Sequence, residues 1–129
     1  MAKRELMEIK KTLEIGAKAY GDLVTLLTFH RASKKVISKP DAYGKLLAEM
    51  AKTIPLDGKD FLEWKDKYHS KRLKLGTKHY DYDYTYLDTA LSEGNDLIAR
   101  LGGKTIPEKK IRAASSVYSL IGDYAMANS

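Results

Sequence analysis

The sequence predicts an all-α protein, with an N-terminal helical arm followed by a small antiparallel four-helix bundle. Apolar residues recur at helical spacing from residue 6 to residue 27 and in four later segments, which proline or glycine separates. Residues 80–86 alternate tyrosine with polar residues as a strand does, but no second strand is predicted to pair with them. The predicted units are therefore a basic helical arm, residues 1–39, and a four-helix bundle, residues 40–129.

A stripe of apolar residues at alternating spacings of three and four predicts the first helix. The stripe consists of Leu6, Ile9, Leu13, Gly16, Tyr20, Leu23 and Leu27. Such spacing is close to that of a coiled-coil seam. Gly16 and Gly21 each weaken a helix by about 1 kcal/mol relative to alanine, so they indicate either close approach to another backbone or a break near Gly21.

Pro40 is predicted to separate the arm from the bundle. Proline disfavours helical geometry in the residue before it and is tolerated in the first turn of a helix. The helix that follows ends before residue 53, and its apolar residues are Tyr43, Leu46, Leu47 and Met50. Connections between the four later helices are short, which favours an antiparallel bundle.

Turn and capping residues predict the other three helices. One begins after a turn in which Asp57 is the N-cap, and Gly76 stops it. The next is capped near Asp83 and stops at Gly102. The last begins after Pro107, which suits the first turn of a helix.

Positive charge is concentrated toward the N-terminus. Residues 1–39 carry nine Lys or Arg against four Asp or Glu, whereas residues 81–129 carry five against seven. This asymmetry predicts that the arm contacts a polyanion, although a solvated face of a lysine-rich protein explains it equally well. The predicted DNA-binding residues are Lys3, Arg4, Lys10, Lys11, Lys18, Arg31, Lys34, Lys35 and Lys39. No sequence-reading motif is present, so binding is expected to be insensitive to base sequence.

Catalytic and metal-binding patterns are weak. His30, His69 and His79 have no histidine partner at helical spacing, and cysteine is absent, so we predict no metal site and no cofactor. Arg72 and His79 resemble the loose Arg–His signature of the HEPN ribonucleases, which implies that the two act on RNA phosphodiesters in a dimer. Leu73 stands where that family usually has a polar residue. We therefore expect no enzyme activity.

The predicted organisation resembles the major capsid proteins of filamentous archaeal viruses, the rod-shaped and lipid-enveloped group. The chain opens Met-Ala-Lys, and residues 97–102, Leu-Ile-Ala-Arg-Leu-Gly, are similar to a helix ending in that family, as is the tyrosine-rich stretch before it. The lysine-rich arm favours the enveloped members, since the rod-shaped ones have arms rich in arginine, serine and aromatic residues. The resemblance implies a location in the virion, and in the host cytoplasm during assembly.

The resemblance also implies partners. Two subunits, identical or paralogous, pair and wrap their arms around double-stranded DNA in the A form, and the bundles tile a helical filament that a lipid envelope can surround. Because the arm has no partner within a small bundle, its apolar stripe is expected to form the subunit interface. For the same reason, the arm is expected to be disordered when the subunit is alone. The predicted interface residues are Leu6, Ile9, Leu13, Tyr20, Leu23 and Leu27.

The sequence therefore favours a structural DNA-packaging protein that binds double-stranded DNA without sequence specificity. Two alternatives stay open. One is a HEPN-like small helical ribonuclease, and the other is an RNA-binding small subunit of a ribonucleoprotein, such as those of CRISPR effector complexes. The packaging hypothesis predicts that deletion of residues 1–39 leaves a folded bundle that does not bind DNA.

Overall fold

The computed structural model describes residues 2–79 and 90–128, and within these ranges it contains five α-helices and no strand. The helices are α1 (Ala2–Phe29), α2 (Lys34–Thr53), α3 (Phe61–Lys78), α4 (Ala90–Arg100) and α5 (Glu108–Ala127). The all-α class is thus confirmed. The tyrosine alternation at residues 80–86 and the predicted cap near Asp83 lie outside the described residues.

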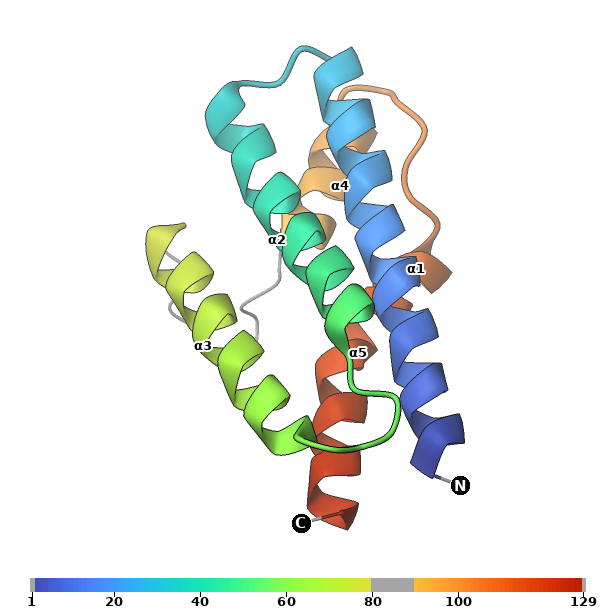
Figure 1. Ribbon diagram of the computed structural model, residues 1–129. Coiled ribbons are helices and arrows are strands. Elements are labelled where there is room, and N and C mark those ends of the chain that lie inside the picture. Colours follow the sequence, from blue (N-terminus) through green and yellow to red (C-terminus); the bar gives the residue numbers. More distant parts are fainter. Residues whose placement is uncertain (1, 80–89, 129) are drawn as a thin grey trace.

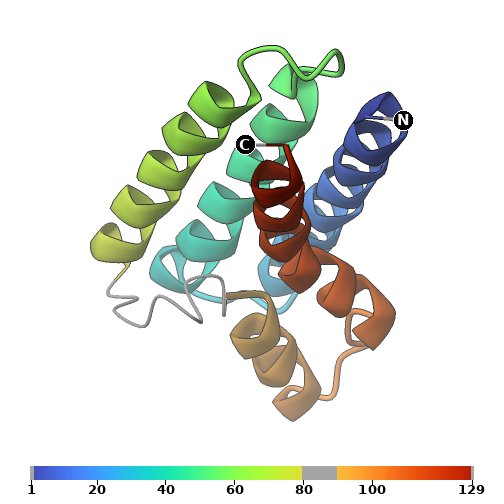
Figure 2. The same cartoon turned by 90° about the horizontal axis from the view of Figure 1, so that it is seen from below.

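The first helix is the central element of the molecule and not an appended arm. α1 packs against α2, α5 and α4, while α2 also contacts α3 and α4. Both chain ends lie at one end of the bundle, and the connection between α1 and α2 lies at the other (Figure 1). Seen along the bundle, α5 lies between α1 and α3 (Figure 2). The predicted arrangement of an arm followed by a four-helix bundle is therefore not confirmed.

The apolar stripe of α1 lies in the core of its own chain. Its six predicted interface residues, Leu6, Ile9, Leu13, Tyr20, Leu23 and Leu27, are all at most 2% exposed and belong to one hydrophobic cluster with residues of α2 to α5. Exposing six such side chains would cost about 12 kcal/mol at about 2 kcal/mol each, which is as large as the stability of a typical domain. In the folded monomer these residues are thus unavailable for a subunit interface, and α1 is ordered without a partner chain.

The predicted boundary at residues 39 and 40 falls inside α2. This helix begins at Lys34, and the side chain of its N-cap residue, Ser33, accepts a hydrogen bond from the Val36 N–H at 3.3 Å. Pro40 is buried within the helix, and residues on both sides of it, Ile37 and Tyr43, contribute to the core. Tertiary packing therefore outweighs the local preference of proline for a helix start.

Other predicted helix ends shift by a few residues. Asp57 does not cap α3; its Oδ1 accepts a hydrogen bond from the Lys59 N–H at 3.0 Å, and α3 begins after Asp60. Gly76 does not stop α3 but is buried within it, and the helix ends at Lys78. α1 continues through Gly21 without a break, and α5 begins after Pro107 as predicted.

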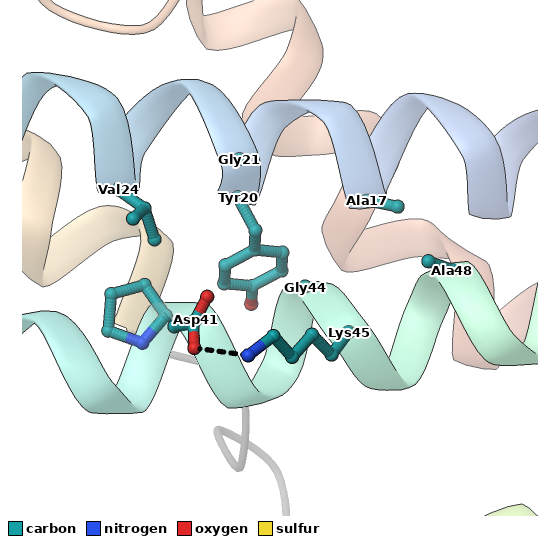
Figure 3. A pocket seen from close by; sticks show the side chains of 9 residues that line it. Ala17, Tyr20, Gly21, Val24, Asp41, Gly44, Lys45 and Ala48 are labelled. Atoms are coloured by element: carbon teal, nitrogen blue, oxygen red, sulfur yellow. Dashed lines mark ion pairs between the residues drawn. The ribbon is translucent and has the colours of Figure 1, made fainter.

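The packing of α2 against α1 requires a glycine at residue 44. A Cβ atom on Gly44 would lie 2.8 Å from the Tyr20 Cβ, which the α1 backbone holds in place, so Gly44→Ala is expected to destabilise the protein by about 1–3 kcal/mol. Gly21 and Gly44 both line a groove between α1 and α2 (Figure 3). A Cβ atom on Gly21, however, would have no neighbouring atom within 4 Å. Gly21→Ala is therefore the matched control and is expected to stabilise α1 by up to about 1 kcal/mol.

Urea denaturation of both variants checks this prediction. Equal stability changes in the two variants would contradict the close packing of α1 on α2.

Candidate nucleic-acid interface

The positive charges of α1 are nearly balanced by acids along the same helix. Its cations are Lys3, Arg4, Lys10, Lys11 and Lys18, and its acids are Glu5, Glu8, Glu14 and Asp22. The Lys18 Nζ lies 3.6 Å from the Asp22 Oδ2. A helix of this length extends about 40 Å, so these charges are diluted over a long surface. Five of the nine predicted DNA-binding residues thus form no concentrated positive surface.

The other four predicted residues lie together at the α1–α2 connection and in the first turns of α2. No acid occurs among residues 30–39. The ends of α3 and α4 add two more cations to this region, since residues of both helix ends line one cavity together with residues from the start of α2. The resulting surface, which we call the basic end, consists of Arg31, Lys34, Lys35, Lys39, Lys78 and Arg100.

The cavity between α2, α3 and α4 has a volume of about 560 Å³. Among the described residues that line it, Glu93 is the only acid, and its Oε2 lies 3.3 Å from the Lys39 Nζ. The Lys39 side chain is only 14% exposed. Because this pair is neutral as a unit, the positive charge at the mouth of the cavity comes from Lys35, Lys78 and Arg100.

The backbone at the tip of the basic end is unusual for an arginine. Arg31 adopts a left-handed conformation with φ of 58°, and its N–H donates to the Thr28 carbonyl at 3.0 Å. The Ala32 N–H donates to the Leu27 carbonyl at 2.9 Å, which completes a Schellman motif at the end of α1. Glycine normally occupies this position, because a side chain there costs about 1 kcal/mol. The fold thus holds a cation where local preference favours glycine.

Two further cations of the basic end also occupy unfavourable positions. Lys34 and Lys35 begin α2, whose first turn contains no acid. The positive end of the helix dipole disfavours cations there by about 0.3–1 kcal/mol each. Violations of local preference concentrate at functional sites, and a bound anion would relieve this repulsion. The arrangement therefore fits a surface that binds a polyanion.

A substitution at Arg31 separates stability from binding. Arg31→Gly is expected to raise the free energy of unfolding by about 1 kcal/mol, because glycine adopts the left-handed conformation without strain, and to weaken binding to DNA severalfold. Arg31→Ala is the control, since it removes the charge but keeps the strain, so it should weaken binding without the gain in stability. Thermal denaturation and fluorescence anisotropy measure the two effects. A lower stability of Arg31→Gly than of the wild-type protein would contradict the left-handed conformation of Arg31.

The residues of the ribonuclease-like pattern have different neighbours. The Arg72 guanidinium carbon lies 3.7 Å from the centroid of the Tyr118 ring in α5. His79 follows α3 and lines the cavity, and its ring centroid lies 6.4 Å from that of Tyr43 in α2. Arg72 thus contributes to the packing of α3 on α5, and His79 faces α2. In the part of the chain that the structure describes, no group of three His, Asp or Glu residues is arranged to hold a metal ion.

Sequence reasoning did not include Lys78 and Arg100 among the DNA-binding residues. Each lies at the last residue of a helix, where a cation is also expected for its favourable interaction with the helix dipole. Only the arrangement of α3 and α4 beside the start of α2 brings them to the same cavity as Lys35. A search for cations in the last turns of the predicted helices would have found both.

Comparisons with known proteins do not identify a relative: no family model, no curated protein and no solved structure matches this chain. Among the described residues, no helix has the length and apolar character required to cross a bilayer. The function is therefore inferred from the chemistry of the basic end.

Proposed function

We propose that the protein is a structural, non-enzymatic DNA-packaging protein whose basic end contacts the phosphates of double-stranded DNA without reading the base sequence. The observation that carries the proposal is the gathering of six cations at the basic end, five besides the Lys39 that pairs with Glu93, and three of these five occupy positions that reduce stability. Phosphate contact requires cations spread over a surface and no particular spacing.

The extent of the basic end fits a duplex better than a small anion. It covers the ends of α2, α3 and α4 together with the α1–α2 connection, and packed helices lie about 8–10 Å apart. The cations are thus spread over about 20 Å, which is comparable to the width of a DNA duplex and allows contact with several phosphates. A single small anion would leave most of them unneutralised.

A packaging filament, in a virion or during its assembly in a host cell, is the wider role that this proposal fits. The capsid proteins that the sequence resembles wrap DNA with arms, whereas here α1 stays within the bundle. Successive subunits along the DNA, identical or paralogous, would therefore touch through their outer surfaces. A helical array then requires these contacts to join two different surfaces head to tail without closing into a ring.

The salt dependence of binding tests the proposal. With about five phosphate contacts, the affinity for a duplex of about 30 bp is expected to fall about 500-fold between about 50 mM and 200 mM salt, and two unrelated sequences should bind with similar affinity. Fluorescence anisotropy measures both quantities. Failure to bind the duplex at the lower salt concentration would overturn the proposal.

The two alternative functions give different results with RNA. Preference for single-stranded RNA over the duplex would indicate a subunit of a ribonucleoprotein. Cleavage of RNA that is lost in His79→Ala, with unchanged stability, would indicate a ribonuclease. Either result would contradict a structural role on DNA.

A further inference from the structure

The basic end exposes an aromatic ring among its cations. Phe29, the last residue of α1, is 77% exposed. Two more apolar side chains, Val36 at 40% and Leu101 at 50%, are exposed beside cations of the same surface. A phenyl ring exposed to water adds nothing to the stability of the folded chain. Aromatic rings flanked by cations are typical of surfaces that stack on nucleobases. Phe29 is therefore a candidate contact to the bases.

The backbone that carries Phe29 is fixed, and one ring lies beside the Phe29 side chain. The His30 ring lies 5.2 Å from the Phe29 ring, centroid to centroid, at an interplanar angle of 87°. His30 packs closely against Gly103 in the α4–α5 connection, where a Cβ atom would force the His30 or Ile98 side chain to shift. The hydrogen bonds of the Schellman motif fix the backbone on the other side. The backbone beneath the ring therefore need not become ordered when Phe29 makes a contact, and only side-chain freedom is lost.

We propose that Phe29 inserts between base pairs of the bound duplex as an apolar wedge, while Arg31 and Lys34 contact the flanking phosphates. The inference rests on the proposed DNA-binding function and adds a mode of binding to it. Wedges of this kind partly unstack one base step and bend the duplex by about 20–90°. Every base step presents an apolar interior, so insertion requires no particular base contact, and flexible pyrimidine–purine steps cost least to unstack.

The shape of the basic end favours a nucleic acid over an anionic membrane. Lys35, Lys78 and Arg100 surround a concave cavity, which a protruding sugar–phosphate backbone can enter. A flat bilayer surface would reach the exposed ring but not the interior of the cavity. Charge and shape together thus favour a nucleic acid over a membrane, and the proposed function makes double-stranded DNA the occupant.

Bending and unstacking of a labelled duplex test the wedge. The duplex, of about 30 bp, carries a donor and an acceptor dye at its ends and 2-aminopurine at internal steps. The wild-type protein is expected to raise both the energy transfer and the 2-aminopurine fluorescence. Phe29→Ala should lose both signals and bind about tenfold more weakly, with an unchanged salt dependence because the phosphate contacts remain. Met126→Ala is the matched control, because Met126 is similarly exposed, at 81%, and belongs to the last turn of α5. The end of α5 lies at the end of the bundle opposite the α1–α2 connection (Figure 1).

Three outcomes would overturn the wedge, and they are distinguishable. If Phe29→Ala binds and bends the duplex as the wild-type protein does, the proposed wedge is wrong and the proposed DNA-binding function stands. Loss of binding of Phe29→Ala to vesicles of phosphatidylglycerol and phosphatidylcholine, with duplex bending unchanged, would assign the ring to a membrane. Failure of the wild-type protein to bind the duplex would overturn the wedge together with the proposed function.

Discussion

Deletion of residues 1–29 is expected to unfold the protein. α1 contacts three of the other four described helices and contributes residues along its whole length to the core, so its removal would expose the facing apolar surfaces of α2, α4 and α5. That loss exceeds the roughly 5–15 kcal/mol by which domains are typically stable. Circular dichroism of the truncated chain measures the effect. A cooperative thermal transition close to that of the full chain would show that α1 is a separate arm.

A single substitution gives a graded form of the same test. Leu13 is completely buried, and Leu13→Ala is expected to lower the free energy of unfolding by about 3 kcal/mol through lost burial and the cavity left behind. Met7 lies on the same helix but is 47% exposed, so Met7→Ala should change the stability by less than about 1 kcal/mol. Equal effects would contradict the placement of the α1 stripe in the core.

Reversal of two charges in the basic end is expected to weaken DNA binding at least a hundredfold. The double variant Lys34→Glu/Lys35→Glu removes two phosphate contacts and adds two repulsive charges. The slope of log affinity against log salt should fall by about two. Folding should not suffer, because acids at the start of α2 interact favourably with the helix dipole and should raise the stability. Anisotropy and thermal denaturation measure these opposite changes.

The matched control places the same charge change on α1. Lys3→Glu/Lys11→Glu alters the net charge equally, but both residues are exposed on a helix whose charges are nearly balanced. Charges separated by more than about 10 Å are largely screened at ordinary salt, so the affinity should fall less than about fivefold. Equal losses in the two variants would mean that net charge, and not the basic end, controls binding.

The periodicity of apolar residues was sufficient to predict the helices but not their assembly. The stripe from Leu6 to Leu27 is correct as a buried face, yet a stripe of this kind fits an intermolecular coiled coil and an intramolecular core equally well. Pro40 then suggested a division of the chain, because the local cost of proline is visible in a sequence and the packing of Ile37 and Tyr43 in the core is not.

The candidate site was predicted in part for a similar reason. Arg31, Lys34, Lys35 and Lys39 are adjacent in sequence, so their cluster is visible without a fold. Lys78 and Arg100 join them only because α3 and α4 end beside α2. Residues 1–29 carry five cations and four acids, so the positive surplus of residues 1–39 lies almost entirely after Phe29. A count over all 39 residues does not show this.

A lysine footprint on the full-length protein locates the DNA-binding surface without any substitution. Acetylation of lysines with and without a saturating duplex, followed by mass spectrometry, reports which amines the DNA covers. We expect protection of Lys34, Lys35 and Lys78 and unchanged reactivity of Lys3 and Lys11. Protection of the α1 lysines, with Lys34, Lys35 and Lys78 still reactive, would contradict the claim that the basic end is the DNA-binding surface.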